Sequence, residues 1–215
     1  MEKNFQMNTW TSDFGKEYTD RNIFSPEDLD QLDIQRFGVT RTYMVKEFLN
    51  DLNIFDKRIL EVGCNVGNEL RFLQREGYKS LYGIEIQHYA VEKAKNLTNG
   101  INIIQGSADD LPFKDKYFDL VFTAGVLIHI SPKDIEKIID EIYRCSKNYI
   151  WGLEYYADQY TEVVYRGQKN LLWKTDFAQL YLDRFPDLKL IKKKNFKYIE
   201  NQSLEDCMFL LKKTK

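Results

Sequence analysis

From residue 58 onward, the chain alternates between short apolar segments and segments with the periodicity of amphipathic helices. Strands that alternate with helices along a chain form a parallel sheet with right-handed crossovers. The alternation therefore predicts an α/β fold with a mostly parallel sheet. The expected strands lie at residues 58–62, 80–86, 101–106, 118–125 and 148–156, and the expected helices at 68–76, 90–97 and from Ser131 through Ile142.

The C-terminal end of the chain breaks this alternation. After a predicted helix at 176–184, two strand-like segments at 188–199 and 204–213 are separated only by "ENQS". So short a connection indicates an antiparallel hairpin. A mostly parallel sheet that ends in an antiparallel hairpin is typical of one variant of the doubly wound, Rossmann-like fold.

The N-terminal segment 1–57 precedes this α/β unit. Trp10, Phe14 and Tyr18 are spaced by four residues, which places them on one face of a helix. A second helical pattern, at 43–52, leads into the first strand. We expect residues 1–57 to form a helical lid or cap on a domain that spans 58–215, the two making one compact domain overall.

The charge and composition of the chain exclude several kinds of partner and site. Its 33 acidic and 31 basic residues give a net charge of −2, which argues against nucleic acid or an anionic membrane as a partner. No apolar run reaches membrane-spanning length, and the N-terminus lacks an apolar signal core. Three scattered cysteines and two histidines predict no metal site and a reduced, cytoplasmic protein. The oligomeric state stays open.

Residues 59–70, "ILEVGCNVGNEL", contain the sharpest motif in the chain. Gly63 and Gly67 bracket a tight strand-to-helix turn, where glycine permits positive φ and lets a ligand approach the backbone. The carboxylate of Glu61 just before the turn is unfavourable beside a pyrophosphate but suits a ligand with a cationic amino-acid group. The alternative is a turn without a ligand, in which Glu61 caps an amide and Glu85 is a surface acid.

Further polar residues follow the next strands. Glu85 ends the second strand, where an acid can accept the hydroxyls of a ribose. Together with Glu61 it describes a nucleoside with a ribose diol and a zwitterionic tail, which is S-adenosylmethionine. The segment "GSADDLPF" (106–113) follows the third strand, where an adenine edge would be bound.

Segments 58–130 are similar to the cofactor motifs of class I S-adenosylmethionine-dependent methyltransferases. The stretches outside them resemble a methyltransferase family named for its association with pseudaminic acid biosynthesis. These stretches are "DFGKEYTDRN" (13–22), "TAGVLIHISP" (123–132), "RCSKNYI" (144–150), "EYY" (154–156), "YRG" (165–167) and "TDF" (175–177). The chain departs from this pattern at Ser107, where the superfamily often has Asp, and at "ADQYTEVV" and "WKT" in the acceptor region.

The resemblance implies methyl transfer to oxygen or nitrogen of a small molecule, with a sugar or nonulosonic acid derivative as acceptor. Two alternatives stay open: an amino-acid-type or other natural-product acceptor, and a protein that binds the cofactor without turnover. The cofactor-binding residues expected on these grounds are Tyr18, Arg21, Glu61, Gly63, Cys64, Asn65, Gly67, Glu85, Ile86, Ser107, Ala108, Asp109, Thr123, Ala124 and Gly125.

The acceptor should bind beyond the carboxyl ends of the strands, beside the cofactor. His129, Glu154 and Tyr156 are the candidate catalytic residues there, and His129 is suited to take a proton from the acceptor. Tyr155 and Arg166 are the candidate substrate-binding residues, Arg166 through a bidentate pair with a carboxylate. The alternatives are a structural His129 at a helix start and a surface ion pair at Arg166.

Overall fold

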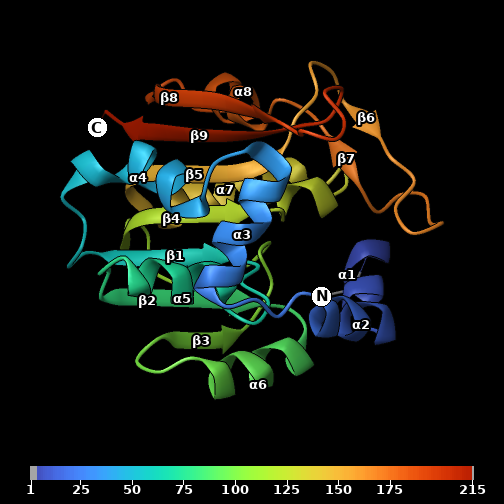
Figure 1. Cartoon of the computed structure of the whole chain (residues 1–215). Coiled ribbons are helices and arrows are strands. Elements are labelled where there is room, and N and C mark those ends of the chain that lie inside the picture. Colours follow the sequence, from blue (N-terminus) through green and yellow to red (C-terminus); the bar gives the residue numbers. More distant parts are fainter. Residues whose placement is uncertain (1–3, 215) are drawn as a thin grey trace.

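The computed structural model describes residues 4–214, so residues 1–3 of the predicted lid and residue 215 lie outside it. A seven-stranded sheet with the order β3-β2-β1-β4-β5-β9-β8 forms the centre of the molecule (Figure 1). The first five of these strands are parallel, and β9 runs antiparallel to both β5 and β8. The predicted Rossmann-like sheet with its antiparallel hairpin is thus confirmed. The strands are β1 (Arg58–Val62), β2 (Ser80–Glu85), β3 (Asn102–Gln105), β4 (Phe118–Ala124), β5 (Ser146–Tyr155), β8 (Leu188–Lys197) and β9 (Glu205–Lys213).

The strand order reverses between β1 and β4. The chain moves outward from β1 to β2 and β3, then returns to place β4 on the other side of β1. The connections that follow β1 and β4 therefore run in opposite directions, which opens a crevice at the carboxyl ends of these strands. Glu61 in β1 lies in register with Gly83 in β2 and Phe122 in β4, so its side chain is held in the middle of the sheet.

The sheet separates two apolar cores. Side chains alternate across each strand, so that Ile59 belongs to one core and Leu60 to the other. Both are fully buried, and burial of a side chain of this size contributes about 1.5–3 kcal/mol. One core is completed by α3 (Pro26–Phe37), α4 (Arg41–Leu49), α5 (Asn68–Arg75) and α6 (His88–Leu97), and the other by α7 (Ile135–Cys145) and α8 (Phe177–Arg184).

Helix α7 begins later than the sequence suggests. Ser131 was expected to cap the helix, but residues 132–134 form a turn in which the amides of Asp134 and Ile135 donate to the Ser131 carbonyl. The helix proper starts at Ile135, with Asp134 at its N-cap. The turn follows directly on a 3-10 helix, η2 (Leu127–His129), and the chain needs these residues to change direction between the two. The predicted apolar stripe of α7 is buried.

The N-terminal helix expected through Trp10 and Tyr18 is in fact two helices, α1 (Phe5–Trp10) and α2 (Asp13–Arg21). The break has a local cause, because the Ser12 hydroxyl accepts a hydrogen bond from the Phe14 amide and so starts a new helix. Trp10 nevertheless contacts Tyr18, with the ring centroids 5.2 Å apart. The single-helix prediction was wrong, although the aromatic cluster it implied does form.

The sequence analysis did not identify α3. Its start carries a strong signal, since Ser25 and Asp28 form a capping box around Pro26, and Gly38 ends the helix at φ 76°. The helix expected at 43–52 is α4 followed by the 3-10 helix η1 (Asn50–Leu52). Leu29, Met44 and Phe48 belong to the first apolar core, so α3 and α4 pack against the sheet.

A second small sheet of β6 (Thr161–Glu162) and β7 (Trp173–Lys174) was also not foreseen. Figure 1 shows this arm and the α1–α2 pair on the same side of the molecule, beyond the carboxyl ends of the parallel strands. The two are joined by a hydrogen bond of 3.0 Å from Gln6 Nε2 to the Asn170 carbonyl. Within residues 4–214 we find no helix with the length and apolar character that crossing a membrane requires.

Candidate active site

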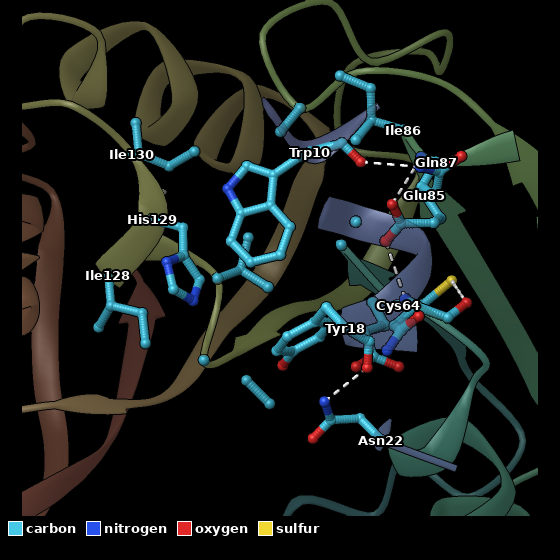
Figure 2. A pocket seen from close by; sticks show the side chains of 18 of the residues that line it. Trp10, Tyr18, Asn22, Cys64, Glu85, Ile86, Gln87, Ile128, His129 and Ile130 are labelled. Atoms are coloured by element: carbon cyan, nitrogen blue, oxygen red, sulfur yellow. Dashed lines mark hydrogen bonds between the residues drawn. The ribbon is translucent and has the colours of Figure 1, made fainter. Parts of the chain in front are cut away.

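A cavity of about 720 Å³ lies at the carboxyl ends of the central strands. Residues of α1, α2 and α3, of the loops after β1, β2, β3 and β4, and of the β6–β7 arm line it. Figure 2 shows the Trp10 indole ring projecting into this space, with His129 on one side and Glu85 and Gln87 on the other. The strand order and the two covering segments thus enclose a single site.

The loop after β1 has the backbone geometry that its glycines predict. Gly63 and Gly67 both have φ 75°, and Asn65 between them has φ 45°. The amides of Gly63 and Cys64 donate to the Ile84 carbonyl, at 2.8 and 3.1 Å, which ties the loop to β2. A Cβ atom on Gly63 would lie 2.7 Å from Val126 Cγ2, a contact that no side chain tolerates. The turn therefore requires glycine at Gly63 for both conformation and space.

Glu61 is buried beneath this loop without a counter-ion. Only 3% of its surface is exposed, and its Oε2 atom has no hydrogen-bond partner among the described residues. Burial, together with the negative charges of Glu69 and Glu85, raises the pKa of Glu61 well above its usual range. A cationic group placed against Glu61 would relieve this cost, so the site fits a ligand with an ammonium group.

Glu85 is held rigidly at the end of β2. Its Oε2 accepts the Asn65 amide at 2.9 Å, and its Oε1 accepts the Gln87 amide at 2.7 Å. Burial raises the pKa of Glu85, while these amides oppose the rise. Each carboxylate oxygen keeps a second lone pair, and both can therefore accept the hydroxyls of a ribose. Together with the Glu61 carboxylate, these hydrogen-bond acceptors fit S-adenosylmethionine.

A buried ion-pair network supports this end of the cavity from below. The Arg41 guanidinium pairs with Asp33 at 2.5 Å and with Glu69 at 2.8 Å. The three residues come from α4, α3 and α5, so the network fixes two N-terminal helices against the helix that follows the glycine loop. Removing one member would leave an uncompensated buried charge, which costs about 3–5 kcal/mol.

Helices α1 and α2 are tied to the cofactor loops by hydrogen bonds. Gln87 Nε2 donates to the carbonyls of Trp10 and Ser12, each at 3.0 Å, across the break between the two helices. Thr19 Oγ1 donates to Asn65 Oδ1 at 3.0 Å. Tyr18 lines the cavity below the Trp10 ring (Figure 2), and burial raises its pKa. The loops after β1 and β2, which are expected to bind the nucleoside, therefore also hold α1 and α2 in place over the cavity.

His129 lies in the cavity wall, 8% exposed, between two aromatic rings. Its ring centroid is 4.6 Å from that of Trp10 and 5.2 Å from that of Tyr165. His129 Nδ1 lies 2.7 Å from the Leu171 carbonyl oxygen, and burial lowers the pKa of His129 to about 4. The imidazole is neutral at physiological pH, and Nδ1 must carry the hydrogen because a carbonyl only accepts.

Glu154 has a supporting position and does not line the cavity. Its carboxylate accepts the Val126 amide at 3.2 Å and the Ile128 amide at 3.4 Å. It is 1% exposed, and burial raises its pKa to about 7 against the opposing hydrogen bonds, of which that from Thr123 is the strongest. Glu154 therefore fixes the loop that carries His129.

The structure brings most of the expected site residues together. Those that line the cavity are Tyr18, Glu61, Gly63, Cys64, Asn65, Glu85, Ile86, Ser107, Ala108, Asp109, Ala124, Gly125, His129, Tyr155 and Arg166. Arg21, Gly67, Thr123, Glu154 and Tyr156 do not line it. Arg21 lies 3.7 Å from Glu17 on the exposed side of α2, and Tyr156 donates to Asp158 at 2.8 Å.

The reasons for these differences are local. Side chains alternate along β5, so that Tyr155 points into the cavity while its neighbours Glu154 and Tyr156 cannot. Gly67 sits at the N-cap of α5, where its φ shapes the turn at a distance from the space itself. Arg21 is in the last turn of α2, two residues after Thr19 and therefore on the opposite side of the helix from this cavity residue.

Trp10, Arg36, Gln87 and Asp206 are among the cavity residues that sequence reasoning missed. Gln87 could have been found from its place two residues after Glu85, at the N-cap of α6, where its side chain accepts the Tyr89 amide. No local signal marks Arg36 or Asp206, because only the packing of α3 against the β8–β9 hairpin brings them to the site.

The chain is similar to known methyltransferases in sequence and in fold. Residues 60–149 match the family model described as "Methyltransferase domain". Sterol methyltransferase-like 2 of Botryococcus braunii is 33% identical over 96 residues, which is 42% of this chain and 24% of that protein. Norajmaline N-methyltransferase of Rauvolfia serpentina is 32% identical over 113 residues, or 47% of this chain and 38% of that protein. The chain thus spans less than half the length of these curated relatives.

The similarity in structure extends over the whole chain. The crystal structure of magnesium protoporphyrin IX methyltransferase from Synechocystis PCC 6803, which has SAH bound, superimposes with a TM-score of 0.68 at 15% identity. The superposition covers 97% of this chain and 98% of that one. Residues 60–149 are therefore similar to a methyltransferase domain, and the chain has the Rossmann-like fold of these methyltransferases.

Proposed function

We propose that this protein transfers a methyl group from S-adenosylmethionine to an oxygen or nitrogen atom of a polar small molecule, a sugar or nonulosonic acid derivative. The observation that carries the proposal is the single cavity that joins two differently equipped ends. The cofactor end holds the orphan carboxylate of Glu61 and the fixed carboxylate of Glu85. The other end is lined by Tyr155, Arg36 and Arg166.

The lining of the second end favours a polar acceptor. Several sequence relatives are named as sterol methyltransferases, whose acceptors are apolar. Here, by contrast, Arg36, Arg166 and Asp206 line the space together with the phenol of Tyr155. Burying an apolar ring system against two guanidinium groups and a carboxylate would desolvate these charges without replacing their hydrogen bonds. A molecule with many hydroxyl groups would replace them.

When bound, S-adenosylmethionine supplies a methyl group on a sulfonium sulfur, which a nucleophilic oxygen or nitrogen displaces in line. The work left to the protein is to hold the two reactants in that line and to exclude water, which can contribute about 7–11 kcal/mol toward the barrier. The covering residues Trp10 and Tyr18 serve the exclusion of water. The rigid loop that Glu154 fixes serves the alignment.

His129 is the group we assign as proton acceptor. Its Nδ1–H is directed to the Leu171 carbonyl, so the lone pair on Nε2 faces away from that bond. An acceptor O–H or N–H hydrogen-bonded to Nε2 would pass its proton there as the new bond to carbon forms. Its lowered pKa makes His129 a weak base, which suits the removal of a proton that has already become acidic during the transfer.

A defined assay tests this function. Purified protein with S-adenosylmethionine is incubated with free and nucleotide-activated sugars, acidic sugars and amino acids, and the products are examined by mass spectrometry for the gain of one CH₂ unit. We expect a gain on a sugar or acidic sugar. Calorimetry that detects no binding of S-adenosylmethionine or S-adenosylhomocysteine would reject the proposed function, and binding with no gain on any acceptor would favour a non-catalytic protein.

A further inference from the structure

Arg36 is an arginine in the cavity wall without a partner. It lies in the last turn of α3, and its guanidinium makes no hydrogen bond or ion pair with any of residues 4–214. Nothing in the fold therefore satisfies its five N–H donors. Arginine side chains that are partly enclosed in a pocket usually find a carboxylate or a phosphate, because the guanidinium fork matches these groups in geometry.

The surroundings of Arg36 are prepared for a polar ligand. Tyr155 and Asp206 line the same part of the cavity, and Asp206 is 6% exposed. The Asp206 carboxylate accepts a hydrogen bond from the Tyr198 hydroxyl at 3.2 Å. Burial raises the pKa of both Tyr155 and Asp206, and the positive charge of Arg36 opposes the rise in each, which places that charge close to both groups.

Arg36 also lies within electrostatic reach of the reacting centre. Burial raises the pKa of Tyr18; among the smaller contributions, the negative charge of Glu85 adds to the rise and the positive charge of Arg36 opposes it. Tyr18, Glu85 and Arg36 line the same cavity. A ligand held by Arg36 would lie beside the cofactor and not on its nucleoside.

The other two arginines of the cavity are poorer anchors. Arg41 is buried and already paired with Asp33 and Glu69. Arg166 is exposed on the β6–β7 arm, where its guanidinium lies 5.9 Å from the Tyr165 ring centroid. An exposed arginine contributes little to an ion pair, because water competes for its donors. The carboxylate pairing considered for Arg166 therefore suits Arg36 better.

We propose that Arg36 and Asp206 form an acceptor subsite, in which Arg36 binds the carboxylate of an acidic acceptor and Asp206 accepts a hydrogen bond from a hydroxyl or ammonium group of the same molecule. The inference rests on the proposed function and narrows it, because it requires the acceptor to be an acid. It covers both hydroxy acids, such as acidic sugars, and amino acids. The two differ in the group that faces Asp206.

Matched pairs of ligands test the subsite. N-acetylneuraminic acid, glucuronic acid and serine are each compared with their primary amides, in which the carboxylate is replaced by a neutral group of nearly the same shape. Binding is measured by calorimetry on protein saturated with S-adenosylhomocysteine, and methyl transfer is measured separately. We expect at least one acid to bind at least tenfold more tightly than its amide, because the amide cannot form the charge-assisted hydrogen bond with Arg36. Tighter binding of a sugar acid would indicate a hydroxy acid as the acceptor, and tighter binding of serine would indicate an amino acid.

Variants separate recognition from stability. Arg36→Gln should abolish the preference for the acid, and Arg36→Lys should keep the helix-end charge but lose at least tenfold in acid affinity, because lysine cannot form the fork. Arg184→Gln is the matched control, since Arg184 is a surface residue of α8 paired with Asp140 outside the cavity. It should leave acid binding unchanged.

Each result has a distinct meaning. Binding of S-adenosylhomocysteine with no acid bound, or equal binding of acids and amides, would overturn the subsite and leave the methyltransferase function intact. Acid binding that Arg36→Gln does not weaken would also overturn it. Failure to bind the cofactor would reject the proposed function, and acid binding could still be measured without it.

Discussion

The Nδ1 atom of His129 lies 2.7 Å from the carbonyl oxygen of Leu171, and this contact fixes the tautomer of the imidazole. The hydrogen resides on Nδ1, and Nε2 keeps its lone pair. Leu171 follows the β6–β7 arm's outer turn, whereas His129 follows β4, so the arm sets the orientation of the histidine. An exposed arm of the chain thus prepares the proposed base.

Replacement of His129 by Ala should lower kcat about 100-fold or more, which is the usual contribution of a positioned base. The affinity for the cofactor should change little. Because the pKa of His129 is lowered to about 4, its basic form is populated throughout pH 6–9, so kcat should be flat there and fall only as the pH approaches 4. Near-normal turnover of the variant would reject the role of His129.

Replacement of Glu61 by Gln should have opposite effects on affinity and on stability. The variant keeps the shape of the side chain but loses the charge that meets the ammonium group, so the Kd for S-adenosylmethionine should rise at least tenfold. The cofactor-free variant should melt at a higher temperature than the wild type at pH 8, because a buried carboxylate without a partner has been removed. Both are measured by calorimetry.

Glu200→Gln is the control for this comparison, since Glu200 is exposed in the β8–β9 turn. It should change neither the Kd nor the melting temperature. A Glu61→Gln protein that binds the cofactor normally would show that Glu61 does not contact the ammonium group.

Glu154 should make stability depend on pH. Its pKa is raised from 4.5 to about 7 in the folded protein, so between these values the folded chain binds a proton that the unfolded chain has lost. This contribution to stability is present below about pH 4.5 and declines as the pH rises to about 7. Relative to Glu154→Gln, the wild type should lose up to about 3 kcal/mol across that interval. Denaturant unfolding at several pH values measures the difference, and a constant difference would contradict it.

Two glycines offer a matched test of the cofactor loop. Gly63 and Gly100 have similar φ values, 75° and 72°, but a Cβ on Gly63 would meet Val126 Cγ2 at 2.7 Å, whereas the nearest atom to one on Gly100 is 3.8 Å away. Gly100→Ala should cost about 1–2 kcal/mol, the usual cost of left-handed backbone for a residue with a side chain. Gly63→Ala should cost more and should abolish cofactor binding. Equal losses of stability would contradict the close contact with Val126.

A structural feature of this protein could be predicted from the sequence when the residues that determine it lie close together in the chain. The strands, the antiparallel hairpin and the positions of Glu61 and Glu85 follow from periodicity and from one loop, because those signals lie within a few residues of each other. The break between α1 and α2 was missed because Ser12 caps a new helix within a continuous aromatic spacing. The start of α7 was missed because its N-cap residue, Asp134, makes no side-chain cap.

The acceptor end was harder to predict for a different reason. Arg36 and Asp206 are separated by most of the chain, and only the packing of α3 beside the β8–β9 hairpin brings them into one cavity. The sequence analysis proposed Arg166 as the acceptor anchor, whereas the subsite that we propose from the structure uses Arg36. Arg36 is half-buried in the cavity wall and Arg166 is exposed, a difference that the sequence alone does not reveal.

The side chain of Gln87 donates hydrogen bonds to the carbonyl groups at the break between α1 and α2. Its main-chain amide donates to the Glu85 carboxylate. A nucleoside that binds to Glu85, or leaves it, would therefore act on Gln87, the residue that also holds α1 and α2 over the cavity. One residue thus links the carboxylate proposed to bind the ribose with the two helices that cover the cavity, so that binding at Glu85 and closure of the cover would be coupled through Gln87.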